Sequence, residues 1–180
     1  MKIAVLGAGA LGCAMGSCLS EAGHDVWLIN RRADQVEAMN QHGLRVRING
    51  VDRSIPVKAS RNAQEIAAQT GTVDLIVVLV KSFHTQEAIT SATAIVGPDT
   101  VVLSLQNGLG HEDVLADVVG RDKVLAGKTY AGGVMLAPGH IIRGTEGKET
   151  YIGELDGRLT DRVQRMAQVF NDAGLITHIS

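Results

Sequence analysis

The sequence predicts a doubly wound α/β fold with a mainly parallel sheet, and three observations support this class. Short apolar segments alternate with helical segments along the whole chain, which is the pattern of successive βαβ units. The segment Val73–Val80 is apolar at nearly every position, as expected of a parallel strand that is covered on both faces. A glycine-rich turn, Gly7–Gly12, separates the first apolar segment from the first helical one.

The remaining elements follow from the same patterns and from the glycines that end them, such as Gly23 after the first helical segment. The strands of the main sheet are expected at Lys2–Leu6, Asp25–Ile29, Val73–Val80, Thr100–Leu105, Val124–Gly127 and Leu175–Ile179. Helices are expected at Ala10–Ala22, Ala33–Gln41, Gln64–Gln69, Thr85–Ala94, Glu112–Val119 and Arg158–Ala173. The last helix has one apolar face, made of Leu159, Val163, Met166, Val169 and Phe170.

Two further regions are expected to form strands outside this alternation. Leu44–Ile48 and Val51–Val57 alternate polar and apolar residues on either side of Asn49-Gly50. Asn-Gly between such segments indicates a β-hairpin, because both turn residues need positive φ. The glycine-rich stretch Lys128–Ile152 is expected to fold as strands around a Pro138-Gly139 turn.

The composition is that of a single globular domain, residues 1–180. A formal net charge of −2 gives no reason to expect a nucleic-acid partner. Four glycines interrupt the apolar N-terminal segment, so it is interpreted as strand, turn and helix and not as a signal peptide. No segment approaches the ~20 apolar residues of a membrane span. We therefore expect a cytoplasmic protein without a membrane partner.

The chain stops on an apolar, strand-like segment with only Ser180 beyond it. Such an ending is expected of the N-terminal part of a longer, two-domain protein. A domain separated in this way exposes apolar surface, so self-association into a homo-oligomer is a further expectation.

The glycine turn has the spacing G-x-G-x-x-G, formed by Gly7, Ala8, Gly9, Ala10, Leu11 and Gly12. It follows a predicted strand and opens a predicted helix, which is the context in which this spacing indicates dinucleotide binding. The first glycine permits a tight turn, the second lets a pyrophosphate approach, and the third lets helix and strand pack closely. The helix N-terminus attracts the phosphates. The alternative is a glycine-rich turn that binds nothing.

The residues after the second strand favour NADP over NAD. Sites for NAD place Asp or Glu at the end of this strand to accept from the ribose 2′-hydroxyl. Here the strand ends in Asn30-Arg31-Arg32, and guanidinium groups suit a 2′-phosphate instead. Arg31 is the expected phosphate ligand, whereas Arg32 is as well explained as a solvated loop residue.

Polar residues also follow two later strands, at the edge where ligands of such sheets bind. Lys81 comes directly after Val73–Val80, and Asn107 follows Thr100–Leu105. The amide of Asn107 can donate and accept, so it could bridge a ribose and a substrate. The alternatives are an exposed lysine at a strand end and a turn residue in an Asn-Gly pair.

No metal site is expected. The six histidines are scattered, without an H-E-x-x-H motif or a Cys/His cluster. Cys13 and Cys18 share one predicted helix and are interpreted as small buried apolar residues. Neither a G-x-S-x-G motif nor a G-x-x-x-x-G-K loop is present, so a hydrolase or kinase has no support.

Taken together, these features resemble the N-terminal domain of the ketopantoate reductase (2-dehydropantoate 2-reductase) family, over essentially the whole chain. The resemblance rests on MKIAVLGAGALG, Arg31, VLVKSFHT around Lys81, LQNGLG around Asn107, and AGKTYAGGVMLAPGHI. Many dehydrogenases share the glycine motif. The lysine, the Asn-Gly-x-Gly turn and the Pro-Gly segment make the resemblance more specific.

The resemblance implies a Rossmann-type domain and NADPH-dependent reduction of ketopantoate, a 2-oxo acid, to pantoate, on the route to pantothenate and coenzyme A. It implies that Gly7–Gly12 hold the pyrophosphate and that Arg31 holds the 2′-phosphate. Lys81 would approach the cofactor, and Asn107 would contact the nicotinamide ribose and the substrate, so these two are the catalytic candidates. Gly133 would pass close to the nicotinamide.

In the family, the lysine that protonates the new alkoxide belongs to a helical C-terminal domain, which the resemblance places beyond the end of this chain. Reduction of a ketone needs such a proton donor. The isolated chain is therefore expected to bind NADPH and to reduce ketopantoate poorly. Two alternatives stay open: the cofactor domain of another 2-hydroxyacid-type dehydrogenase, and an NADP-binding module without catalytic activity.

Overall fold

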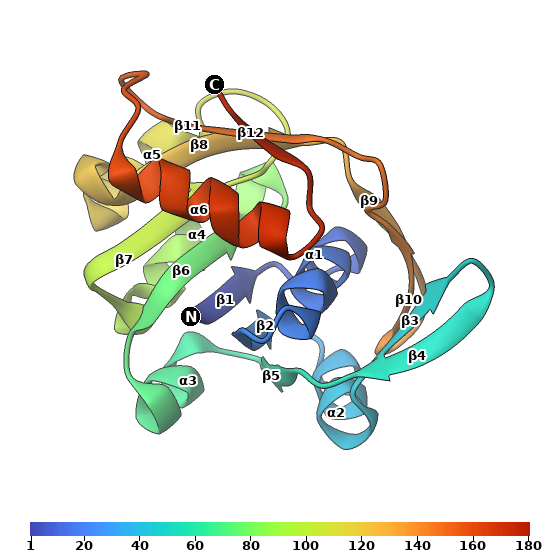
Figure 1. Cartoon of the computed structure of the whole chain (residues 1–180). Helices are drawn as coiled ribbons and strands as arrows, with labels where there is room; N and C mark the ends of the chain where they lie inside the picture. The colour runs from blue at the N-terminus through green and yellow to red at the C-terminus, as the bar shows by residue number, and fades with distance from the viewer.

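The computed structural model describes residues 1–180, apart from the side chain of Ser82, and the described chain forms two sheets and six α-helices (Figure 1). Among these helices, none combines the length and the apolar character that crossing a membrane needs. The strands are β1 (Lys2–Leu6), β2 (Asp25–Ile29), β3 (Leu44–Ile48), β4 (Val51–Ile55), β5 (Lys58–Ser60), β6 (Val73–Val78), β7 (Val96–Ser104), β8 (Val124–Thr129), β9 (Gly132–Ala137), β10 (His140–Gly144), β11 (Thr150–Glu154) and β12 (Thr177–Ile179). The α-helices are α1 (Ala10–Glu21), α2 (Ala33–His42), α3 (Ala63–Thr70), α4 (Thr85–Ser91), α5 (His111–Val119) and α6 (Asp161–Asp172).

The larger sheet is doubly wound and mainly parallel, as predicted. Its order is β12-β11-β8-β7-β6-β1-β2-β5, and its strands are parallel from β5 to β8. β11 runs antiparallel to β8, and β12 runs parallel to β11. The chain builds outward from β1 to β2 and β5, then returns to β6 on the other side of β1. The order therefore reverses at β1 and β6, and such a switch point is where open α/β sheets bind ligands.

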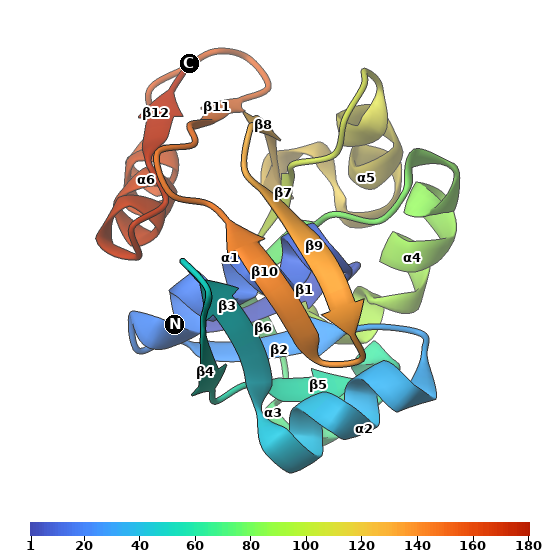
Figure 2. The same ribbon diagram turned by 90° about the vertical axis from the view of Figure 1, so that its right-hand side faces the viewer.

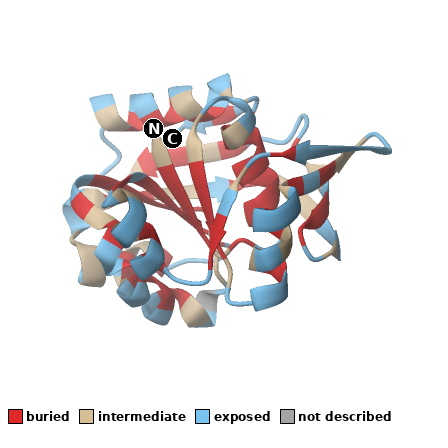
Figure 3. Cartoon of the chain, turned by 90° about the horizontal axis from the view of Figure 1, so that it is seen from below, coloured by how far each residue is buried: buried red, intermediate tan, exposed pale blue. Residues whose placement is uncertain are grey.

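Two apolar layers, one on each face of this sheet, form the core. Alternate residues of β1 divide between them: Ile3 and Val5 pack with α1 and α6, whereas Ala4 and Leu6 pack with α3, α4 and α5. Figure 3 shows the buried strands between helices whose outer surfaces are exposed. Burial on both faces explains why the strand sequences are apolar with little alternation.

A smaller sheet joins two segments that lie far apart in the sequence. Its order is β4-β3-β10-β9, with β10 parallel to β3 and antiparallel to β9. The predicted hairpin is present, and its turn residues Asn49 and Gly50 have φ of 52° and 78°. This sheet packs over α1, which contacts β3, β9 and β10 (Figure 2). The helix that follows the glycine turn is thus held between two sheets, an arrangement that was not expected from the sequence.

Two details correct the expected elements. An unexpected strand, β5, pairs with β2 at the edge of the larger sheet. Leu159, expected on the apolar face of the last helix, precedes α6 and is 67% exposed. The other expected members of that face are at least partly buried, because the helix begins only at Asp161 and turns them toward the sheet.

A cluster of three polar side chains, Arg47, Asp52 and His140, links the hairpin to β10. Asp52 Oδ1 lies 2.9 Å from Arg47 Nε, and Asp52 Oδ2 lies 3.1 Å from His140 Nε2. The hydrogen bond from Arg47, and after it the one from His140, lower the pKa of Asp52 to about 2. An unperturbed aspartate has a pKa of about 3.9. The contribution of the Asp52 carboxylate to stability is therefore present above about pH 4 and is lost as the pH falls toward 2.

We expect Asp52→Asn to lower the Tm at neutral pH by a few degrees at most, because the cluster is half exposed and screened by water. The difference from the unsubstituted chain should vanish near pH 2, where Asp52 itself becomes neutral. Thermal unfolding followed by circular dichroism at a series of pH values measures this. A difference in Tm that stays constant down to that pH would contradict the role given to Asp52.

Candidate cofactor site

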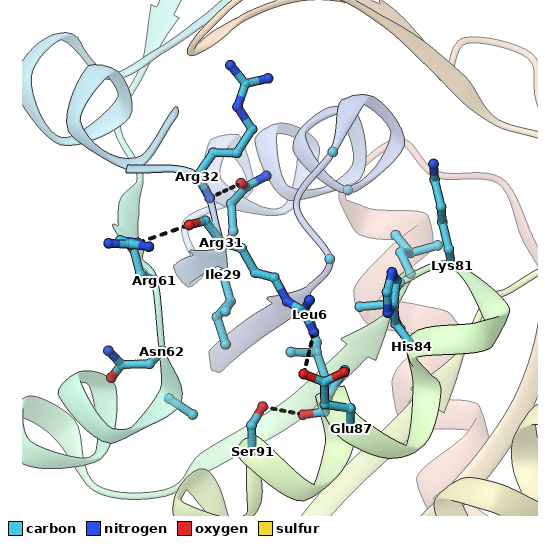
Figure 4. Close-up of a pocket in the computed structure, with 18 of the residues that line it drawn as sticks. Leu6, Ile29, Arg31, Arg32, Arg61, Asn62, Lys81, His84, Glu87 and Ser91 are labelled. Carbon is cyan, nitrogen blue, oxygen red and sulfur yellow. Dashed lines mark hydrogen bonds and ion pairs between the residues drawn. The ribbon is translucent and has the colours of Figure 1, made fainter. Parts of the chain in front are cut away.

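A cleft of about 770 Å³, the candidate cofactor cleft, lies at the switch point, beyond the carboxyl ends of β1, β2 and β6. One wall consists of the glycine turn and the residues that follow β2 and β5. The other consists of the residues that follow β6 and one side of α4 (Figure 4). Its volume is within the range of small-molecule sites, about 300–1,000 Å³.

The three glycines of the turn differ in what surrounds them. Gly7 has a φ of +100°, and a Cβ there would lie 2.6 Å from the backbone nitrogen of Val80. A Cβ on Gly12 would lie 2.6 Å from the carbonyl oxygen of Gly7. A Cβ on Gly9 would have no other described atom within 4 Å. The fold itself therefore requires Gly7 and Gly12, whereas the backbone at Gly9 borders open space that a phosphate can enter.

The N-terminus of α1 lacks the acidic partners that the other helices have. Within the described residues, its first turn holds no acidic side chain, and Gly9 offers no capping side chain. Each of the other five α-helices carries an acidic residue in its first turn. The first N–H groups of α1 and the positive end of its dipole are thus available to an anion. Together with the open space at Gly9, they fit a pyrophosphate.

Asn30, at the end of β2, holds the glycine turn in place. Its Nδ2 donates to the carbonyl oxygen of Ala8 at 2.8 Å, and its Oδ1 accepts from the backbone nitrogen of Arg32 at 2.8 Å. The sequence showed only that no carboxylate stands here. The structure adds that the amide has a positioning role, which needs a donor and an acceptor on one side chain.

The two arginines after β2 point in different directions (Figure 4). Arg31 reaches across the cleft, and its Nη2 lies 3.1 Å from Glu87 Oε1. Arg32 turns away and donates two hydrogen bonds to Asp34, of 3.1 and 2.6 Å. These bonds also lower the pKa of Asp34. Arg31 therefore presents its guanidinium to the cleft, and its contact with a 2′-phosphate stays a prediction.

Arg61 adds a third guanidinium to this end of the cleft, and it was not predicted. It follows β5, and its Nε donates to the carbonyl oxygen of Arg31 at 2.9 Å. Because β5 is parallel to β2 and adjoins it, residues after both strands reach the same edge of the sheet. Recognising β5 as a strand would have identified Arg61.

The structure places the two catalytic candidates in different clefts. Lys81 is exposed in the cofactor cleft, on the wall opposite Arg61 (Figure 4). Asn107 lines a second cleft of about 440 Å³, together with Lys128 and Tyr151. The backbone at Asn107 is fixed, because His111 Nε2 donates to its carbonyl oxygen at 2.6 Å.

Gln106 connects the two clefts. It is buried, and its Nε2 donates to the carbonyl oxygen of Val80 at 2.9 Å and to Thr85 Oγ1 at 2.7 Å. The segment before Lys81 is thus fixed to the segment before Asn107. This positioning role was also not predicted from the sequence.

We expect Gln106→Leu to lower the free energy of unfolding by about 1–3 kcal/mol, because buried acceptors lose their donor. Urea denaturation measures the loss, and Gln86→Leu, an exposed glutamine of α4, is the matched control. Equal stability of the two variants would show that the bonds of Gln106 do not hold the segments together.

Gly133 lies on β9 against the first residue of α1, outside the residues that line either cleft. A Cβ there would lie 2.7 Å from the carbonyl oxygen of Ala10. The glycine therefore lets the smaller sheet approach the start of α1. Its contact with a nicotinamide stays a prediction.

Burial keeps the thiol of Cys13 unreactive. It raises the pKa of Cys13 to about 12, and the hydrogen bond from Gln35 offsets this only in part. The thiol is thus protonated at neutral pH and is no nucleophile. In the described part of the chain, no three His, Cys, Asp or Glu side chains are grouped as metal ligands would be.

A glycine turn at the switch point of a doubly wound sheet, with guanidinium groups beyond the second strand, is the arrangement typical of dinucleotide-binding domains. Residues 3–157 match the family described as Ketopantoate reductase PanE/ApbA. The chain therefore belongs to the ketopantoate reductase family, and the resemblance noted in the sequence is confirmed.

Curated relatives match the chain along its whole length. The 2-dehydropantoate 2-reductase of Pyrococcus abyssi is 39% identical over 180 residues, which are 100% of this chain and 56% of the relative. That of Archaeoglobus fulgidus is 35% identical over 178 residues, which are 97% of this chain and 54% of the relative. The chain thus spans about half the length of the curated relatives that it matches.

Solved structures also match the chain along its whole length. The 2-dehydropantoate 2-reductase from Geobacter metallireducens GS-15 is similar with a TM-score of 0.89 and 32% identity, covering 100% of this chain and 58% of that one. A D-mandelate dehydrogenase with NADH and anilino(oxo)acetate is similar with a TM-score of 0.91 and 27% identity, covering 100% of this chain and 57% of that one. The family and the NADH-bound neighbour indicate a nicotinamide cofactor.

Proposed function

We propose that this chain is the cofactor-binding half of an NADPH-dependent 2-dehydropantoate 2-reductase, which reduces ketopantoate to pantoate. The observation that carries the proposal is the cofactor cleft. The open backbone at Gly9 and the uncapped N-terminus of α1 lie along one wall, and the guanidinium of Arg31 reaches across the cleft. Membership of the family supports the reaction. The preference for NADPH is supported by Arg31 and by the lack of a carboxylate after β2.

When bound, NADPH supplies the hydride that reduces the ketone. In this chain, Gly7–Gly12 hold the pyrophosphate and Arg31 holds the 2′-phosphate. Lys81 contacts the cofactor from the opposite wall, and Asn107 bridges the ribose and the substrate. The alkoxide also needs a proton donor. We place it outside the 180 residues, so this chain binds the cofactor and leaves ketopantoate almost unreduced.

A cytoplasmic location and a small 2-oxo acid as partner, without nucleic acid or membrane, belong to the same proposal. The same proposal includes the division of the parent protein into this domain and a second one. Self-association of the isolated chain stays a prediction, which its hydrodynamic size in solution would test.

The test compares the full product of the parent gene with the 180-residue chain, with oxidation of NADPH in the presence of ketopantoate as the readout. We expect turnover by the full product, a lower kcat/KM for its Asn107→Ala variant, and almost no turnover by the chain alone. Rapid turnover by the chain that is lost in Lys81→Ala would contradict this and would make Lys81 the proton donor.

The second candidate is the cofactor domain of another 2-hydroxyacid-type dehydrogenase. The similarity to a D-mandelate dehydrogenase with NADH favours it, and so does the presence of the carboxylate of Glu87 in the cleft. Assays of the full product with several 2-oxo acids and with both NADH and NADPH distinguish the two. Reduction of another 2-oxo acid in preference to ketopantoate would support this candidate.

A further inference from the structure

Glu87 is the one carboxylate among the described residues that line the cofactor cleft. It stands in the first turn of α4, on the wall opposite the end of β2. Its Oε1 lies 3.1 Å from Nη2 of Arg31, so one ion pair bridges the two walls (Figure 4). The side chains of Arg31 and Glu87 are 63% and 70% exposed.

An ion pair this exposed is weak and can be displaced. Exposed pairs are held loosely, because water screens both charges. A phosphate monoester carries nearly two negative charges and three acceptor oxygens, so it binds a guanidinium more strongly than one carboxylate does. Displacement does not remove the carboxylate, however. Glu87 keeps its negative charge beside Arg31 and opposes a phosphate that binds there.

Glu87 does not occupy the position at which sites for NAD carry their carboxylate. Asn30 stands at the end of β2, where sites for NAD carry Asp or Glu. Its amide is hydrogen-bonded to the glycine turn. Glu87 brings a carboxylate to Arg31 from the other wall. A cofactor without a 2′-phosphate does not compete with Glu87 for Arg31, and Glu87 repels its other phosphates only through screened, long-range electrostatics.

From these contacts, we infer that Glu87 determines how strongly the site prefers 2′-phosphorylated over unphosphorylated adenosine cofactors. It holds Arg31 in the free protein and opposes the phosphate in the complex. The inference rests on the proposed cofactor site and adds a specificity-determining residue to it. Removing the charge of Glu87 should therefore make the chain more selective for a 2′-phosphate.

The test is calorimetric titration of the chain and of Glu87→Gln with two probes, adenosine 2′,5′-bisphosphate and 5′-AMP, which differ only in the 2′-phosphate. We expect the variant to bind the bisphosphate about three- to tenfold more tightly, since a weak ion pair and a repulsion are both removed. Binding of 5′-AMP should change by less than about threefold, through long-range electrostatics alone, and by less than binding of the bisphosphate. Glu37→Gln on α2, which removes the same charge outside the cleft, should change neither affinity.

The same titration in an Arg31→Ala background separates the two effects of Glu87. The gain from Glu87→Gln should be smaller there, because no guanidinium is left to be released. An equal gain in both backgrounds would contradict the holding role.

The possible failures are distinguishable. If the unsubstituted chain prefers the bisphosphate but Glu87→Gln leaves that preference unchanged or weaker, the inference fails and the cofactor site stands. Equal weakening of both probes would also overturn it, since Glu87 would then contact the adenosine. If the unsubstituted chain binds neither probe, the proposed function fails, and the inference fails with it.

Discussion

Gly9→Ala is expected to weaken NADPH binding about 10- to 100-fold while the fold stays intact, since a methyl group would enter the space that we propose for the pyrophosphate. The fold should tolerate the change, because a Cβ at Gly9 meets no other described atom within 4 Å and its φ of −79° suits alanine. Calorimetric titration measures the affinity, and thermal unfolding measures the stability.

Gly12→Ala is the matched comparison, because the same methyl group is added within the same turn. Its Cβ would lie 2.6 Å from the carbonyl oxygen of Gly7 and 3.1 Å from Val5 Cγ1. We expect it to lower the free energy of unfolding by about 1–3 kcal/mol, as overpacking does. Binding of NADPH to Gly9→Ala with the affinity of the unsubstituted chain would show that the phosphates do not approach this turn.

Arg31→Ala should weaken NADPH binding about 10- to 100-fold, because a charge-assisted hydrogen bond to the 2′-phosphate contributes about 1.5–3 kcal/mol. NADH lacks that phosphate, so its affinity should change little. The Tm should also change little, because the ion pair with Glu87 is exposed. Titration of the variant with both cofactors measures the loss of preference.

Arg32→Ala is the control for this prediction. It removes the same charge from the neighbouring residue, but Arg32 points away from Arg31 and is paired with Asp34 (Figure 4). Its effect on NADPH should be less than about threefold, through long-range electrostatics alone. A large loss in Arg32→Ala with none in Arg31→Ala would reverse the assignment.

Features set by local sequence could be predicted. The glycine turn follows from its spacing and its place between strand and helix, and the hairpin follows from Asn49-Gly50. The central strands of the larger sheet were recognised because burial on both faces makes them apolar. The cleft followed from topology, since ligands bind at the switch point.

Features set by pairing between distant segments could not be predicted. β5 has only three residues, Lys58–Ser60, and becomes a strand because it pairs with β2. Without it, Arg61 had no expected position. The smaller sheet depends on pairing of β10 with β3 across much of the sequence. The meeting of Glu87 and Arg31 likewise depends on how α4 packs against the sheet, which no local pattern specifies.

The most direct test of the central claim is calorimetric titration of the unsubstituted 180-residue chain with NADPH and, separately, with NADH. We expect NADPH to bind at least about tenfold more tightly, which corresponds to about 1.4 kcal/mol from the 2′-phosphate contacts. Equal or tighter binding of NADH, or no binding of either cofactor, would contradict the assignment of this chain as an NADPH-binding domain.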